Sequence, residues 1–108
     1  MRIEILTVPD CPNGPVLTQR LATVLGDDPE VLVVQRSVTD PQEAARRGMH
    51  GSPTLLIEGR DPFADPDTPP SLSCRLYRAP DGSQQGAPSV EDLRSALGRV
   101  AEPGLDLS

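Results

Sequence analysis

The sequence lacks lysine and tryptophan entirely and has only two aromatic residues, Phe63 and Tyr77. A hydrophobic core must therefore be built from valine, leucine, isoleucine and alanine. All ten basic side chains are arginines, and the sequence has 16 acidic residues, which gives a net charge of −6. Because duplex affinity comes mainly from basic side chains on phosphates, this balance argues against nucleic acid as a partner.

Long apolar runs are also missing. Residues 1–8 are too short and too charged for a secretory signal, and no run approaches the length of a membrane span. We therefore expect a cytoplasmic protein with no membrane partner. Two cysteines, Cys11 and Cys74, are too few for a disulfide scaffold, and in a reducing compartment both are expected to be free thiols.

The length of 108 residues suits one domain, which we expect at 1–100, followed by a flexible C-terminal tail at 101–108. Hydrophobic patterning predicts strands over 2–8, 30–38, 54–57 and 73–79, and helices over 15–26, 41–47 and 89–100. The β-branched run at 31–34 indicates a strand buried on both faces. Asp40 is a good N-cap for the second helix. The segment 59–72 is rich in proline and aspartate and is typical of a long loop.

The predicted order β-α-β-α-β-β-α indicates an α/β fold. A right-handed crossover should join the first two strands in parallel. The last two strands should form an antiparallel hairpin, which completes a four-stranded mixed sheet with helices on both faces. A first helix that began at Cys11 would be strained at Pro15, so we expect it to begin near Pro15, with Cys11 in the preceding turn.

Two short segments resemble the thioredoxin-like superfamily. Residues 48–56, Gly-Met-His-Gly-Ser-Pro-Thr-Leu-Leu, are similar to the family's helix-to-strand segment, and Cys11 follows the first strand as the family's active-site cysteine does. The resemblance covers roughly residues 2–100. It implies a thioredoxin-like fold with a cis Ser52–Pro53 bond, in which the backbone of Ser52 pairs with an extended substrate or a thiol cofactor. It also implies the site residues: Cys11 as the catalytic thiol, with Pro12, Ser52, Pro53 and Thr54 binding substrate.

The family's C-x-x-C motif reads Cys11-Pro12-Asn13-Gly14 here. Gly14 replaces the resolving cysteine, so a dithiol cycle within the motif is excluded. The carboxylate of Asp10 should disfavour a neighbouring thiolate, whereas a helix N-terminus favours one. His50 is a possible general base for Cys11, although an exposed loop histidine is the more ordinary interpretation.

Cys74 is the second candidate thiol. In a regular hairpin, Cys74 would begin the fourth strand at the end of the sheet opposite Pro53, about 15–20 Å from Cys11. A disulfide needs Cα atoms within about 7 Å, so a direct bond would be excluded unless the 59–72 loop folds back toward Cys11. Otherwise Cys74 is expected to be a buried, small apolar residue. No metal site is expected, because two cysteines and one histidine are widely spaced and fall short of four ligands.

Three functions remain open. The first is a monothiol redox or thiol-transfer protein that uses Cys11, with no cofactor and with a protein or a low-molecular-weight thiol or disulfide as partner. The second is a non-catalytic binding module that offers its cis-proline groove to a peptide. The third is handling of organomercurials, because the chain is similar to short sequences labelled alkylmercury lyase. True organomercurial lyases use two cysteines and an aspartate, residue types that Cys11, Cys74 and Asp10 would supply.

Overall fold

The structure is a computed structural model, and it describes residues 1–26, 28–64 and 67–101. The elements in chain order are β1 (Arg2–Thr7), α1 (Asn13–Leu25), β2 (Leu32–Ser37), α2 (Pro41–Arg47), β3 (His50–Ser52), β4 (Thr54–Ile57), β5 (Ser71–Cys74), β6 (Tyr77–Arg78), β7 (Gln84–Gln85) and α3 (Val90–Ala101). None of the helices described is long and apolar enough to cross a membrane. The predicted flexible tail, apart from Ala101 in α3, lies outside the described residues.

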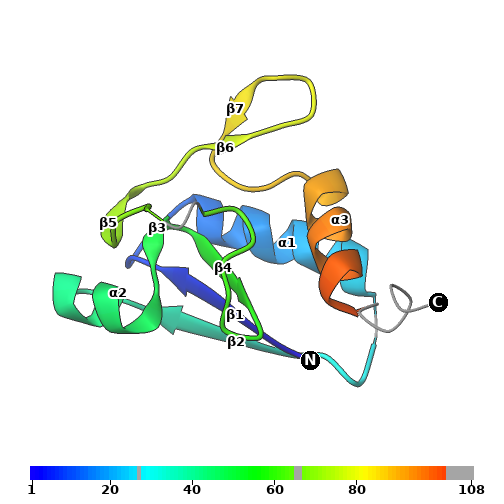
Figure 1. The fold of residues 1–108 in the computed structure, drawn as a ribbon, viewed down its shortest axis with the longest axis horizontal. Helices are drawn as coiled ribbons and strands as arrows, with labels where there is room; N and C mark the ends of the chain where they lie inside the picture. Colours follow the sequence, from blue (N-terminus) through cyan, green and yellow to red (C-terminus); the bar gives the residue numbers. More distant parts are fainter. Residues whose placement is uncertain (27, 65–66, 102–108) are drawn as a thin grey trace.

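The main sheet has three strands in the order β2-β1-β4 (Figure 1). β1 runs parallel to β2, with Ile3 opposite Val33, and antiparallel to β4, with Ile5 opposite Leu55. The parallel pairing of the first two strands is therefore confirmed. The prediction of a four-stranded sheet is wrong, because within the described residues the main sheet ends at β4, which has no strand on its outer edge.

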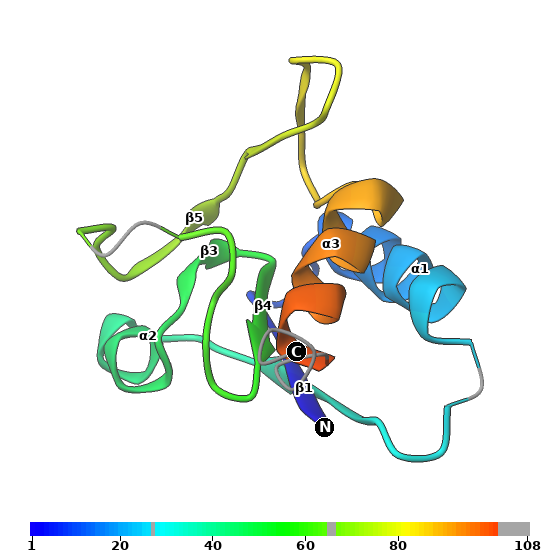
Figure 2. The same ribbon diagram turned by 45° about the vertical axis from the view of Figure 1, so that its right-hand side comes forward.

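Helices cover both faces of this sheet, as the alternation of strands and helices along the sequence predicts (Figure 2). On one face α1 and α3 pack against side chains of β1 and β4. The buried residues there are Ile3, Ile5, Leu17, Leu21, Leu55, Ile57, Ala87, Leu93, Ala96 and Leu97. On the other face α2 and the residues around it bury a smaller cluster, Leu6, Val38, Ala44, Met49 and Leu56. The core is aliphatic, as the scarcity of aromatic residues requires.

The prediction that β2 is buried on both faces is wrong. Leu32 and Val33 are 58% and 37% exposed. The reason is that β2 forms the edge of the sheet, while α1 packs against Ile3 and Ile5 of the neighbouring strand β1. A run of branched apolar residues therefore marks a strand here without marking full burial.

The helix ends follow local sequence rules. α1 begins at Asn13, two residues before the expected start, and Cys11 lies outside it as predicted. Pro15 falls in the first turn, where its missing N–H breaks no intrahelical hydrogen bond. In α2 the N–H of Glu43 donates to the Asp40 carboxylate at 2.7 Å, which confirms the predicted cap.

The predicted fourth strand, 73–79, is replaced by two separate strands. The strand that follows β4 in the described chain is β5, which lies alongside β3 and is parallel to it. β6 and β7 then form a hairpin that projects from the body of the molecule (Figure 1). The register places Cys74 opposite Ser52. The premise that Cys74 lies at the end of the sheet opposite Pro53 is therefore wrong.

Candidate functional site

Cys11 closes a turn between β1 and α1. Its N–H donates to the carbonyl oxygen of Val8 at 3.3 Å, and its own carbonyl accepts from the N–H of Gly14 at 3.3 Å. The residue is half-buried and carries a free thiol. The turn therefore holds the cysteine immediately before the N-terminus of α1.

The Cys11 turn is joined directly to the segment around Pro53. The N–H of Val8 donates to the hydroxyl of Ser52 at 3.0 Å. The Ser52–Pro53 bond is cis, which confirms that prediction. Ser52 is only 1% exposed, so its hydroxyl serves this contact within the protein. The two segments that the sequence singled out thus meet at one end of the sheet.

The buried Thr54 hydroxyl is fully used by neighbouring residues. It donates to the carbonyl oxygen of Gly51 at 2.6 Å and accepts from the N–H of His50 at 3.1 Å and from Nη1 of Arg75 at 3.3 Å. A hydroxyl has one proton to donate and two lone pairs to accept with, so no capacity is left for a substrate. Thr54 shapes the site from within the protein.

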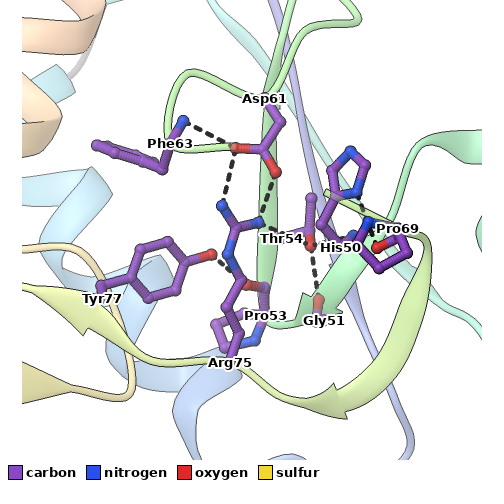
Figure 3. Close-up of polar contacts among 9 residues, drawn as sticks. All are labelled: His50, Gly51, Pro53, Thr54, Asp61, Phe63, Pro69, Arg75 and Tyr77. Atoms are coloured by element: carbon purple, nitrogen blue, oxygen red, sulfur yellow. Dashed lines mark hydrogen bonds and ion pairs between the residues drawn. The ribbon is translucent and has the colours of Figure 1, made fainter. Parts of the chain in front are cut away.

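Arg75 is the centre of a buried network that the sequence did not single out (Figure 3). Its guanidinium binds both carboxylate oxygens of Asp61, with Nη2 3.2 Å from Oδ1. The two side chains are only 10% and 4% exposed. The Arg75 guanidinium carbon also lies 4.6 Å from the centroid of the Tyr77 ring, and Phe63 meets that ring edge-on.

Tyr77 connects this network to the cis-proline. Its hydroxyl donates to the carbonyl oxygen of Pro53. Burial raises the pKa of Tyr77 well above its ordinary value; Arg75 opposes the shift, and the negative charges of Asp61 and Cys11 add to it. The phenol therefore stays protonated and keeps its role as a donor.

β5 occupies the position that the resemblance assigns to a substrate strand. The N–H of Arg75 donates to the carbonyl oxygen of Ser52 at 3.1 Å. Packing is close here, since a Cβ added to Gly51 would lie 2.8 Å from the Cβ of Arg75. The Ser52 carbonyl is thus already paired within the chain. Cys74 is exposed in β5, so its predicted burial is wrong.

His50 and Pro12 take other positions. Nδ1 of His50 lies 3.3 Å from the carbonyl oxygen of Pro69, which places the ring against the returning 59–72 segment. Pro12 is exposed and is the N-cap residue of α1.

A pocket of about 600 Å³ opens beside Cys11, between α1 and the outer part of the sheet. Its walls include Val8 and Asp10 from the turn, Thr18 from α1 and Gln35 from β2. Of the described residues that line it, Asp10 is the one that carries a charge. Pro12, Ser52, Pro53 and Thr54 are not among those residues, so this space lies apart from the cis-proline segment.

The arrangement offers one half-buried thiol that lines a pocket, in a turn that is hydrogen-bonded through Val8 to Ser52. Within 1–26, 28–64 and 67–101, no group of three or more His, Cys, Asp or Glu side chains is placed to hold a metal ion, so Cys11, Cys74 and Asp10 do not form such a group.

Comparison with family models, with curated proteins and with solved structures gives no match for this chain.

Proposed function

We propose that this chain is a thioredoxin-like protein in which Cys11 exchanges its thiol with low-molecular-weight disulfides. The observation that carries the proposal is the position of Cys11. It is half-buried, precedes the N-terminus of α1, and opens onto a pocket of about 600 Å³. Thiol exchange needs a reachable sulfur with space beside it for the leaving group, and a helix N-terminus favours the attacking thiolate. A cytoplasmic location would supply small thiols to reverse the reaction.

A small disulfide suits this site better than a peptide strand. Pairing of an extended peptide with Ser52 would require its backbone carbonyl, which accepts from the N–H of Arg75. A peptide would therefore have to displace β5 and break into the buried network behind it. The pocket beside Cys11 needs no such rearrangement. For this reason we rank the non-catalytic peptide-binding module second.

Organomercurial handling ranks third. Cleavage of a carbon–mercury bond by the known enzymes requires two cysteines and an aspartate around one metal ion. Asp10 lines the pocket beside Cys11, whereas Cys74 lies in β5 opposite Ser52. Within the described residues, the three side chains do not form a group placed to hold one metal ion.

The charge of the pocket predicts its preference among disulfides. Asp10 is an exposed carboxylate next to the thiol, and the chain as a whole carries a net charge of −6. Two unit charges about 6 Å apart in water interact by roughly 0.7 kcal/mol, which is about threefold in rate per charge. Neutral and cationic disulfides should therefore react faster than anionic ones.

The test compares three disulfides of different charge: cystamine, 2-hydroxyethyl disulfide and oxidised glutathione. In the Cys74→Ser protein, intact-mass measurements should show a mixed disulfide at Cys11 that forms fastest with cystamine and slowest with oxidised glutathione. In the same Cys74→Ser background, Asp10→Asn should reduce the difference in rate among the three disulfides, and Cys11→Ser should abolish the mixed disulfide. A Cys11 thiol that reacts with all three no faster than the exposed Cys74 thiol does in the Cys11→Ser protein would refute the proposal.

A further inference from the structure

Cys74 and Cys11 lie on the two segments that flank Ser52. On one side, the N–H of Val8 donates to the Ser52 hydroxyl, and Val8 in turn accepts the hydrogen bond that positions Cys11. On the other side, β5 places Cys74 directly opposite Ser52. Neighbouring strands are only about 4.8 Å apart, so Cys74 is one strand spacing from the residue that holds the Cys11 turn.

The side-chain direction of Cys74 matches that of Ser52. Residues directly opposite each other on neighbouring strands place their side chains on the same face. Ser52 and Cys74 are register partners next to an irregularity between His50 and Ser52, and the Ser52 hydroxyl points toward Val8. We therefore expect the thiol of Cys74 on the face that carries the Cys11 turn. Unlike Ser52, Cys74 is exposed, which leaves its sulfur free to move.

We infer that Cys74 is the resolving thiol for Cys11, so that the two form a reversible internal disulfide. This inference rests on the proposed reactivity of Cys11. A disulfide requires Cα atoms within about 7 Å. Residues 9–12 lie outside helices and strands, and this is the segment that would adjust to bring the two sulfurs into contact.

The chemistry runs in two balanced steps. The Cys11 thiolate attacks one sulfur of a small disulfide RSSR, its S–S bond breaks, and one RS⁻ leaves and takes up the proton that Cys11 released. The Cys74 thiolate then attacks the Cys11 sulfur, and the bond to the remaining SR group breaks. The second RS⁻ takes the proton of Cys74, so RSSR is reduced to two RSH while the two cysteines are oxidised. An excess of a low-molecular-weight thiol reverses both steps.

The position of the pocket favours this second step. The attacking, central and leaving sulfurs lie roughly in line during thiol–disulfide exchange. Cys11 lines the pocket, where the SR group would lie, whereas Ser52 and Cys74 are not among its lining residues. The SR group would therefore depart on the pocket side, and the Cys74 thiolate would attack the Cys11 sulfur from another side.

The experiment treats the full chain with 2-hydroxyethyl disulfide and follows intact mass and free thiols. In the wild type we expect a product that has lost two hydrogens and both free thiols. In Cys74→Ser we expect the mixed disulfide at Cys11 to accumulate, on the order of tenfold above its level in the wild type, because an internal thiol acts at a high effective concentration. Circular dichroism checks that each variant is folded.

A matched control moves the thiol by one residue. The double variant Ser73→Cys with Cys74→Ser keeps two thiols in the protein, but successive residues of a strand point to opposite faces. It should accumulate the Cys11 adduct as Cys74→Ser does. Equal accumulation in the wild type and in Cys74→Ser would overturn the inference and leave the reactivity of Cys11 intact. An adduct that forms at Cys11 in neither protein, with no internal disulfide, would instead overturn the proposed function.

Discussion

The buried pair of Arg75 and Asp61 should be the most sensitive point of the structure to single substitutions. The two side chains are 10% and 4% exposed, so solvent screens their interaction much less than it would at the surface. Removing one partner leaves the other charge buried without compensation, which costs about 3–5 kcal/mol. A domain of this size has a total stability of about 5–15 kcal/mol, so either single substitution should remove a large part of it.

A double-mutant cycle separates the pair from its surroundings. Arg75→Met keeps an unbranched aliphatic side chain but removes the guanidinium that lies over the Tyr77 ring, and Asp61→Asn keeps an oxygen that can accept from the N–H of Phe63 at the same place. Each single variant should lower the free energy of unfolding, measured with urea, by about 3 kcal/mol or more. The double variant leaves no unpaired buried charge, so its loss should be smaller than the sum by about 2 kcal/mol.

The matched control is Arg46→Met, which removes an exposed arginine of α2 and should change stability by no more than about 0.5 kcal/mol. Additive losses in the cycle, or a loss in Arg75→Met no larger than that of the control, would refute the reasoning. The first result would mean that the two charges do not interact across the 59–75 return. The second would mean that Arg75 is solvated.

Two further predictions concern residues that hold the cis-proline segment. Burial raises the pKa of Tyr77, the only tyrosine, so above about pH 10 the unfolded chain releases the phenolic proton before the folded chain does. The free energy of unfolding of the wild type should therefore fall by up to about 1.4 kcal/mol per pH unit in that range. Urea titrations of Tyr77→Phe should lack this slope. At pH 7 the same variant should be less stable by about 1 kcal/mol, since the Pro53 carbonyl loses its donor. Gly51 and Gly59 both have positive φ, but only at Gly51 would an added Cβ meet neighbouring atoms. Gly51→Ala should therefore lower the free energy of unfolding by about 1–3 kcal/mol, and by more than Gly59→Ala does. Equal losses in the two variants would show that β3 and β5 are not closely packed.

Local sequence rules predicted much of the fold. The Asp40 cap, the position of Cys11 before α1 and the parallel pairing of the first two strands follow from short-range chemistry and from the handedness of β-α-β units. These features depend on residues a few positions apart or on general steric rules. The meeting of the Cys11 turn with the Ser52 segment followed from the family resemblance, and the structure places a hydrogen bond between Val8 and Ser52 there.

The path of the chain after β4 could not be predicted in the same way. The sequence shows a proline-rich loop followed by an apolar strand, and a hairpin is the simplest connection for that pattern. In the structure, the segment after β4 is joined to the rest of the site by the pairing of Arg75 with Asp61 and of Tyr77 with Pro53, contacts across 14 and 24 residues. A lone arginine, aspartate or tyrosine in a sequence carries no sign of its partner. The scarcity of aromatic residues was the one signal that drew attention to Tyr77.

The same return determines both the stability of the site and its proposed chemistry. Arg75 directly follows Cys74, and its backbone N–H is bound to Ser52 while its guanidinium is bound to Asp61. A buried ion pair therefore fixes the backbone next to an exposed thiol. If the chain formed the expected hairpin instead, Cys74 would lie at the far end of the sheet and Cys11 would have no second thiol within reach. The network that holds Arg75 against Ser52 is thus also what places Cys74, the thiol that we propose as the resolving one, opposite Ser52.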